Sequence, residues 1–253
     1  MVGRTDSVIG ERTTRDATLG RSVRLFRAFL KEQSDPDHFY SILAADSVHQ
    51  ISSYVPLNGR LILDVGGGPG YFADAFRAAG AAYHGIDPDV GELSARGEPA
   101  AGMVRASGTE LPIRTDAVDI CYSSNVLEHV ADPVRMLDEM VRVTKPGGTV
   151  FVSFTPWLSP WGGHETAPWH FLGGHFARNR YRRKNGREPK NRFGESLFAL
   201  SIGKTLRWAR ETDAATVVRA LPRYHPWWAT WIVRVPLLRE IASWNLVLVL
   251  RKR

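Results

Sequence analysis

The 253-residue sequence predicts an α/β protein with a seven-stranded, mostly parallel β-sheet that is covered by helices on both faces. Three observations predict this fold class. From residue 61 onward, short apolar runs alternate with amphipathic helical stretches, which is the pattern of successive βαβ units. A glycine-rich loop follows the first of these runs. Two further apolar runs near the C-terminus bring the expected number of strands to seven.

The N-terminal part of the chain precedes the sheet and is expected to contain two helices. Residues 1–20 are polar and lack an apolar period, which predicts a flexible tail. In residues 21–33 the apolar side chains fall on one side of a helix and the arginines on the other. A second helical stretch follows at residues 37–54.

Five strands are expected in the first part of the sheet, at residues 61–65, 82–86, 103–106, 118–123 and 149–154. The connecting helices are clearest at residues 71–79 and 132–144. In the second of these helices, Asp132 is suited to cap the N-terminus and Pro133 to the first turn. Because right-handed crossovers connect such strands, the five should lie parallel in one sheet with both faces covered.

The regular alternation stops after residue 154, and two insertions are expected on the substrate side of the sheet, at residues 156–200 and 221–243. The remaining elements are one helix and two strands, at residues 201–213, 216–220 and 244–253. The expected organisation is therefore a single domain over residues 21–253, with a ligand-binding core at residues 55–155.

Composition excludes several classes of protein. Hydrophobic residues make up 43% of the chain and charged residues 23%, which is typical of a folded domain rather than of a disordered one. The single cysteine, Cys121, excludes an internal disulfide and a multi-cysteine zinc site, and we expect no metal site. The N-terminus lacks a signal-peptide apolar run, and no stretch approaches the roughly 18 uninterrupted apolar residues of a membrane span. These features predict a cytoplasmic protein.

The formal charge of +7 comes from one segment. Residues 176–192 contain eight Lys or Arg residues and one acidic residue, so the rest of the chain sums to zero. Such a run is most often a solvated loop, and the alternative is a peripheral contact with anionic lipid at the inner face of the membrane. We expect no nucleic-acid partner, because neither a motif for holding a flipped base nor an RNA-binding module is recognisable.

The run LILDVGGGPGYF at residues 61–72 combines a buried strand, the carboxylate of Asp64 and a glycine loop that opens a helix. The glycines let the backbone turn tightly and approach a ligand closely. A dinucleotide fingerprint, G-x-G-x-x-G, would require glycine where this chain has Tyr71. The spacing is G-x-G-x-G instead, which suits adenosine joined to an amino acid because no pyrophosphate has to be accommodated. The alternative for Asp64 is a carboxylate that only caps loop amides.

A second carboxylate follows at the proper interval. Asp87 ends the next strand in the motif GIDPD, about twenty residues after the loop. At this position an acidic residue accepts hydrogen bonds from ribose hydroxyls. The alternative for Asp87 is an ordinary Asp-Pro turn.

Across residues 55–155 the chain resembles the class I S-adenosylmethionine-dependent methyltransferases of type 11, which have a Rossmann-like fold. The matching segments are DVGGGPG at 64–70, GIDPD at 85–89, ASGTELPIRTDAVDICYSSNVLEHV at 106–130 and TKPGG at 144–148. The chain is also similar to a group of uncharacterised actinobacterial methyltransferases, through FTPWLSPWGGHE and a segment of the FPRYHP kind.

The resemblance implies that the cofactor is S-adenosylmethionine. It implies that Asp64 and the glycine loop hold the methionine portion, that Asp87 holds the ribose, and that the segment after the third strand contacts adenine. Where the family usually has an acidic residue this chain has Ser107, which leaves the adenine to Ser107 and the nearby backbone. The expected cofactor-binding residues are Asp64, Gly66, Gly67, Gly68, Gly70, Asp87, Ser107, Gly108 and Asn125.

The acceptor is expected to bind in the insertion after the fifth strand. We predict His164 as the general base and Glu165 as the carboxylate that orients it, the alternative being that both are surface residues of a glycine-rich loop. Trp157, Trp169 and His170 are expected to contact the substrate. All eight tryptophans lie after residue 156, and those not needed for packing would line a pocket for an apolar or sugar-like acceptor.

The predicted function is methyl transfer from S-adenosylmethionine to a small-molecule, lipid or glycolipid acceptor, at a hydroxyl group. Two alternatives stay open: a nucleic-acid methyltransferase that uses residues 176–192, and a non-catalytic module that binds the cofactor or a membrane. Glu128 and His129 match the family's stretch after the fourth strand, and His129 is given no catalytic role.

Overall fold

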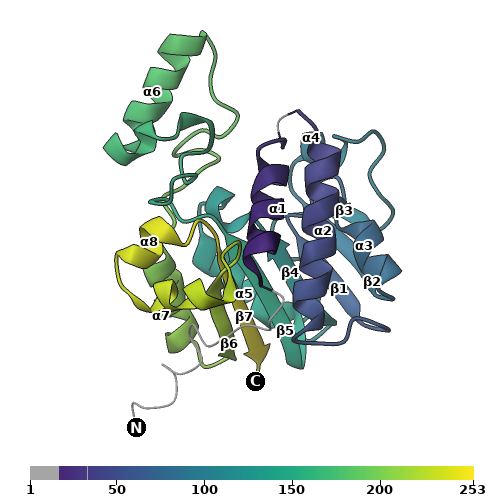
Figure 1. Ribbon diagram of the computed structural model, residues 1–253. Coiled ribbons are helices and arrows are strands. Elements are labelled where there is room, and N and C mark those ends of the chain that lie inside the picture. The colour runs from purple at the N-terminus through teal and green to yellow at the C-terminus, as the bar shows by residue number, and fades with distance from the viewer. Residues whose placement is uncertain (1–16, 33) are drawn as a thin grey trace.

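The computed structural model describes residues 17–32 and 34–253, and it has the predicted α/β architecture (Figure 1). The strands are β1 Leu61–Val65, β2 Ala82–Asp87, β3 Met103–Arg105, β4 Val118–Ser124, β5 Thr144–Phe154, β6 Ala215–Pro222 and β7 Leu246–Lys252. They form one seven-stranded sheet in the order β3-β2-β1-β4-β5-β7-β6. Strand β7 runs antiparallel to both of its neighbours, β5 and β6, and the other neighbouring strands pair in parallel. The predicted fold class is therefore confirmed.

Helices cover the two faces of the sheet. On one face lie α1 Leu19–Phe29, α2 Pro36–Ser52 and α3 Ala73–Ala78, and on the other lie α5 Pro133–Val143 and α7 Ile202–Glu211. Successive side chains of a strand point to opposite faces of the sheet, so one strand contributes to the hydrophobic core on each face. In β1, Ile62 packs under the first group of helices, and Leu63 and Val65 pack under the second.

Helix boundaries follow the capping residues. Thr18 caps α1 and Asp35 caps α2, each through a side-chain oxygen that accepts a backbone N–H. Helix α1 therefore begins at Leu19, inside the tail predicted for residues 1–20; residues 1–16 of that tail lie outside the described part of the chain. Asp132 caps α5 as expected, and Pro133 occupies its first turn.

Residues 176–185 of the basic run lie in a helix, so the prediction of a loop is wrong for them, whereas residues 186–192 lie outside helices and strands. Helix α6, Gly174–Asn185, stands away from the sheet with the short η3 helix Trp169–Leu172 at its base, and it ends at Gly186 in the left-handed conformation (Figure 1). The return segment packs along it, because Arg178 forms ion pairs with Glu188 at 2.8 Å and with Glu195 at 2.7 Å. We call residues 169–196 the arm.

Five short elements complete the described fold: α4 Val90–Leu93, η1 Leu127–His129, η2 His164–Thr166, η4 Trp227–Arg234 and α8 Leu238–Ala242. Strand β5 starts five residues before the predicted position, at residue 144 instead of 149, so Gly147 and Gly148 lie within the strand. Within residues 17–32 and 34–253, no helix combines the length and apolar character needed to cross a membrane.

Candidate functional site

The glycine loop lies at the carboxyl end of β1, where the strand order of the sheet reverses between β1 and β4. The backbone N–H groups of Gly66 and Gly67 donate to the Ile86 carbonyl at 2.7 and 3.1 Å, which fixes the loop against β2. Gly66 has φ 81°, and a Cβ there would lie 2.4 Å from Val126, so only glycine fits. A Cβ on Gly68 would meet no described atom within 4 Å, so the backbone there is open to a ligand.

Asp64 points from the end of β1 into the interior beside this loop. Its side chain is buried, and the Tyr83 hydroxyl donates a hydrogen bond of 2.6 Å to Oδ2. Burial raises the pKa of Asp64 to about 7, the Tyr83 hydrogen bond opposes this rise, and the nearby Asp87 charge adds to it. A cationic ligand would offset the burial of this carboxylate.

Asp87, at the end of β2, joins the same group. Its carboxylate accepts a hydrogen bond from the Gly68 N–H at 3.0 Å and another from the Asp89 N–H at 2.9 Å. Burial raises the pKa of Asp87, and these two backbone donors partly oppose the rise. The first carboxylate, the glycine loop and the second carboxylate therefore converge on one place, and each Asp87 oxygen keeps a lone pair for another donor.

The remaining predicted cofactor residues border this region. The segment that contains Ser107 and Gly108 follows β3, and it begins beside Asp87, because the Ala106 N–H donates to the Asp87 carbonyl at 3.2 Å. The exposed Ser107 hydroxyl forms a hydrogen bond of 2.8 Å with that of Thr109. Asn125 follows β4 with φ 57°, and its side-chain oxygen accepts a hydrogen bond from Asn245 at 2.7 Å.

His164 lies in the short helix η2 His164–Thr166, with the left-handed φ of 47°. Its Nε2 is buried and has no hydrogen-bond partner among the described residues. Burial lowers the pKa of His164 to about 3, and the adjacent His129 lowers it further, so the ring is neutral at pH 7. The predicted pairing with Glu165 is wrong, because that carboxylate instead accepts hydrogen bonds from Asn191 at 3.1 and 3.2 Å.

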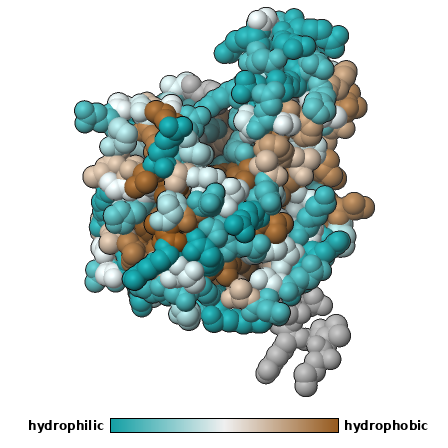
Figure 2. Space-filling view, turned by 180° about the vertical axis from the view of Figure 1, so that it is seen from behind, coloured by the Kyte–Doolittle hydropathy of each residue, from teal (hydrophilic) through white to brown (hydrophobic). Residues whose placement is uncertain are grey.

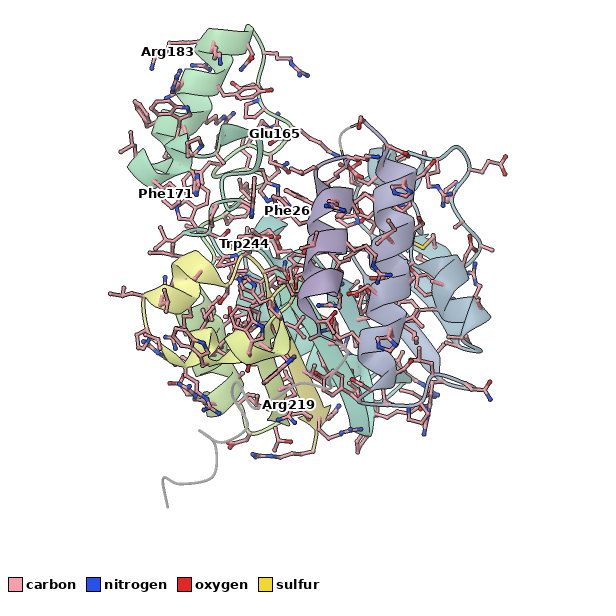
Figure 3. All side chains as sticks on the ribbon, in the orientation of Figure 1. Phe26, Glu165, Phe171, Arg183, Arg219 and Trp244 are labelled. Atoms are coloured by element: carbon pink, nitrogen blue, oxygen red, sulfur yellow. The ribbon has the colours of Figure 1, made fainter. Side chains whose placement is uncertain are left out.

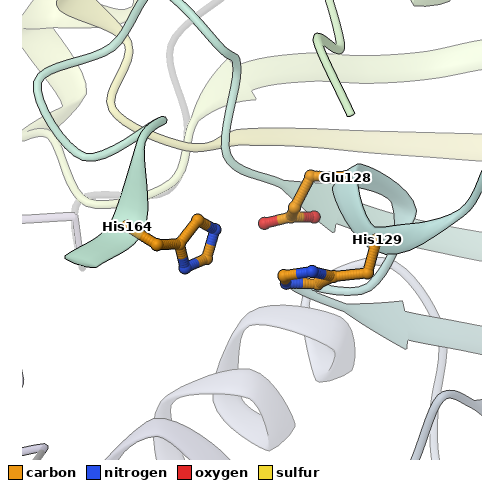
Figure 4. A group of neighbouring side chains, drawn as sticks. All are labelled: Glu128, His129 and His164. Atoms are coloured by element: carbon orange, nitrogen blue, oxygen red, sulfur yellow. The ribbon is translucent and has the colours of Figure 1, made fainter. Parts of the chain in front are cut away.

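The residues that accompany His164 are Glu128 and His129, from the short helix η1 Leu127–His129 after β4. The three side chains point toward one another (Figure 4), and we call them the His–Glu triad. The ring centroids of His129 and His164 are 5.0 Å apart, and Glu128 is 1% exposed. Burial raises the pKa of Glu128, which His129 and the Thr155 hydrogen bonds partly oppose.

The three predicted substrate-binding residues fall into two environments. Trp157 and His170 pack together at the base of the arm with ring centroids 5.2 Å apart, and His170 is buried, with its Nε2 bonded to the Ser159 carbonyl at 3.0 Å. This arrangement is structural packing rather than an open pocket. Trp169 instead lies on the outside of the arm, where the Arg180 guanidinium stacks over its ring at 3.9 Å.

Two phenylalanines of α1 join tryptophans in an aromatic cluster beside the triad, and the part these phenylalanines play was not expected from the sequence. Phe26 and Phe29 of α1 contact Trp161, with ring centroids 6.2 and 5.1 Å apart, and Phe26 also contacts Trp244 at 5.9 Å (Figure 3). The Trp161 carbonyl accepts the His164 N–H at 2.9 Å, so the cluster adjoins the triad directly. Only the apolar period of α1 hinted at these phenylalanines, and it indicated packing.

A buried arginine was also not expected. Arg223 follows β6 and is 0% exposed. Its guanidinium donates to the hydroxyls of Ser47, Ser124 and Ser153 at 2.7, 2.7 and 2.6 Å. It therefore ties the C-terminal part of the chain to α2, β4 and β5 beneath the candidate site.

Comparisons with known proteins agree with this geometry. Residues 63–152 match the model of a methyltransferase domain family. An uncharacterized methyltransferase of Mycobacteroides abscessus is 52% identical over 250 residues, covering 94% of this chain and 96% of the relative. One from Mycobacterium tuberculosis is 53% identical over 246 residues, covering 93% and 96%.

Among solved structures, an S-adenosylmethionine-dependent methyltransferase from Mesorhizobium loti superposes with a TM-score of 0.55 at 19% sequence identity, covering 84% of this chain and 97% of the other, which shows a shared fold. The chain therefore belongs to the methyltransferase family of these relatives, and it shares its fold with an S-adenosylmethionine-dependent methyltransferase of known structure.

Proposed function

We propose that this methyltransferase transfers the methyl group of S-adenosylmethionine to a hydroxyl of a small-molecule or lipid-type acceptor. The single observation that carries the acceptor part of the proposal is the aromatic cluster adjoining the His–Glu triad. It places a large apolar surface beside groups that can bind or deprotonate an oxygen.

The convergence of Asp64, the glycine loop and Asp87 fits the cofactor. S-adenosylmethionine is cationic at its sulfonium and ammonium groups, and the buried Asp64 carboxylate is the group that a cation would stabilise. The open backbone at Gly68 allows close approach, and Asp87 beside it can accept ribose hydroxyls. Ser107, Gly108 and Asn125 would border the bound nucleoside, with Gly66, Gly67 and Gly70 shaping the loop.

The chemistry is an in-line displacement at a methyl carbon that the sulfonium already activates, so the protein mainly aligns the nucleophile and excludes water. The acceptor hydroxyl loses its proton to a base of the triad or to solvent water while the oxygen–carbon bond forms. The carbon–sulfur bond breaks, and its electron pair stays on sulfur. The acceptor oxygen would lie at the triad, because two imidazoles and a carboxylate that can bind a hydroxyl are gathered there at the edge of the aromatic cluster.

The experiment is incubation of the protein with methyl-labelled S-adenosylmethionine and separate lipid, glycan and small-molecule extracts. We expect label in an apolar, base-stable methyl ether product, and loss of that product when Phe29→Ala and Trp161→Ala remove the aromatic surface. Label found only in RNA or DNA would overturn the acceptor class. Cofactor binding without transfer in any extract would favour a non-catalytic module.

We also propose that the arm contacts anionic membrane lipid, which would bring a lipid-type acceptor to the site. Apolar side chains are exposed at its base: Trp169 42%, Phe171 48%, Leu172 66% and Phe176 43%. The basic residues of α6 continue from them, and Figure 2 shows the hydrophilic end of the arm above apolar side chains at its base. Such a pairing of exposed apolar and basic residues suits the interface of an anionic bilayer.

A further inference from the structure

The His–Glu triad has the composition of a metal site. Glu128, His129 and His164 each offer one ligand atom, and these three atoms lie within 4.8 Å of one another (Figure 4). Glu128 and His129 follow β4, and His164 comes from the insertion after β5, so the group closes only when the chain folds. It lies at the carboxyl end of the parallel strands, on the same edge as the glycine loop.

Two buried polar atoms of the triad have no hydrogen-bond partner among the described residues. They are Oε2 of Glu128 and Nε2 of His164. Leaving a buried polar atom unpaired is unfavourable, more so for a charged group, so folded proteins rarely leave two together. A bound cation would pair with both atoms at once, since each carries a free lone pair.

Neighbouring backbone groups also hold the His129 ring and the Glu128 carboxylate in place as possible metal ligands. The Nδ1 of His129 is 2.7 Å from the Ser196 carbonyl oxygen, which can only accept, so Nδ1 carries the proton and Nε2 keeps its lone pair. The second oxygen of Glu128, Oε1, accepts the Thr155 N–H at 3.0 Å. Ligands of protein metal sites are held in this way, by a backbone carbonyl on the far nitrogen of a histidine and a donor on the carboxylate.

His164 is held in a conformation that its residue type rarely adopts. Its φ of 47° lies in the left-handed region, which is unfavourable for a non-glycine residue. The preceding Gly163 packs against the His170 ring, where a Cβ would lie 2.5 Å from a ring atom, so this turn cannot relax away from the site. The fold thus directs the imidazole of His164 toward Glu128 and His129.

We propose that Glu128, His129 and His164 bind one divalent first-row metal ion, such as Zn²⁺ or Mn²⁺. Two imidazoles and one carboxylate are the ligands such ions accept, and three protein ligands leave open positions. Two ligands of a tetrahedral zinc ion are about 3.4 Å apart, given bonds of about 2.1 Å, so the side chains would close by roughly an ångström. This inference replaces the expectation of no metal.

The role of the ion rests on the proposed function. An open position would receive the acceptor oxygen and favour loss of its proton to solvent water, as a bound cation does for water. The oxygen–carbon bond then forms while the carbon–sulfur bond breaks. The aromatic cluster, which adjoins His164, would hold the apolar part of the same acceptor.

Metal binding can be measured without any acceptor. The protein is stripped with a chelator and titrated calorimetrically with Zn²⁺ and, separately, with Mn²⁺, whose electron paramagnetic resonance signal reports the bound fraction. We expect one ion per chain, and binding weakened by about tenfold to a hundredfold in Glu128→Gln and in His164→Asn. The matched control is His175→Asn, an exposed arm histidine outside the triad, which should bind as the unmodified chain does.

Titration with S-adenosylmethionine in every variant separates a lost site from a lost fold. A chain that binds the cofactor yet takes up neither ion saturably would overturn the proposal, and so would full metal affinity in both triad variants. Saturable metal binding without methyl transfer to any hydroxyl would leave the metal site standing and overturn the acceptor chemistry. Methyl transfer that persists unchanged in chelator, with no metal bound, would leave the acceptor chemistry standing and overturn the role of the ion in it.

Discussion

The protonation of one residue, Asp64, links the interior of the sheet to ligand binding. Its carboxyl group is buried beside the glycine loop, and burial raises its pKa to about 7. A folded-state pKa above the ordinary value of 3.8 means that the protonated form is the more stable one in the ligand-free protein. In the ligand-free protein, the contribution of this group to the free energy of unfolding is fully present below about pH 4. It is lost as the pH rises through 7.

A cationic cofactor should reverse this preference, because it binds the ionised carboxylate. We therefore expect the affinity for S-adenosylmethionine to rise between pH 6 and 7.5 by roughly fivefold to tenfold, as Asp64 ionises. Tyr83→Phe removes the hydrogen bond that opposes the rise in pKa, and should shift the midpoint to higher pH. Calorimetric titration across this range measures both effects. A flat or falling affinity in the unmodified chain would contradict this role for Asp64.

At the scale of elements, the strands were the easiest part of the fold to predict. Mostly apolar runs mark β1, β4 and β7, because central strands are buried on both faces. Helix α6 was missed for the opposite reason: only Gly174 and Ala177 of it are buried, so it has no apolar period. Its ion pairs with Glu188 and Glu195 are tertiary contacts that no local pattern announces.

The connection between β6 and the parallel strands depends on Arg223, and removing it should loosen the C-terminal half. Arg223→Ala eliminates three hydrogen bonds and leaves a cavity, so we expect the free energy of unfolding to fall by about 2–4 kcal/mol. Urea denaturation measures the change. Arg207→Ala, on the exposed side of α7, is the control and should change stability by less than about 0.5 kcal/mol. Equal stability of the two variants would show that the buried arginine is not a structural tie.

The candidate site could be predicted only in part. Residues that follow consecutive strands could be placed together from the sequence, and residues that a long insertion brings together could not. Asp64, the glycine loop and Asp87 follow consecutive strands, so the motif spacing alone places them together. Glu128 and His164 are brought together by the insertion after β5, whose path has no sequence period. The sequence therefore indicated His164 but assigned it the neighbouring Glu165 instead of the distant Glu128.

At the scale of the whole molecule, the arm presents a surface of basic and exposed apolar side chains away from the sheet. We expect the protein to sediment with vesicles containing phosphatidylglycerol, and to do so far less with pure phosphatidylcholine, because α6 is basic. Replacing Phe171 and Leu172 by Ser should reduce vesicle binding several-fold. Val104→Ser, an exposed change on the remote strand β3, is the matched control. Equal binding to both kinds of vesicle, or no effect of the arm variant, would contradict a membrane role for the arm.

The central claim is that two carboxylates and a glycine loop form one binding site for S-adenosylmethionine. Calorimetric titration of the unmodified chain, Asp64→Ala, Asp87→Ala and Asp89→Ala tests it most directly. Asp89 caps α4 two residues beyond Asp87 and serves as the control. We predict saturable binding that the first two changes each weaken by about tenfold or more, since a hydrogen bond to a charged group contributes roughly 1.5–3 kcal/mol, while Asp89→Ala binds nearly as well as the unmodified chain. Unchanged affinity in both Asp64→Ala and Asp87→Ala would contradict the assignment of the site.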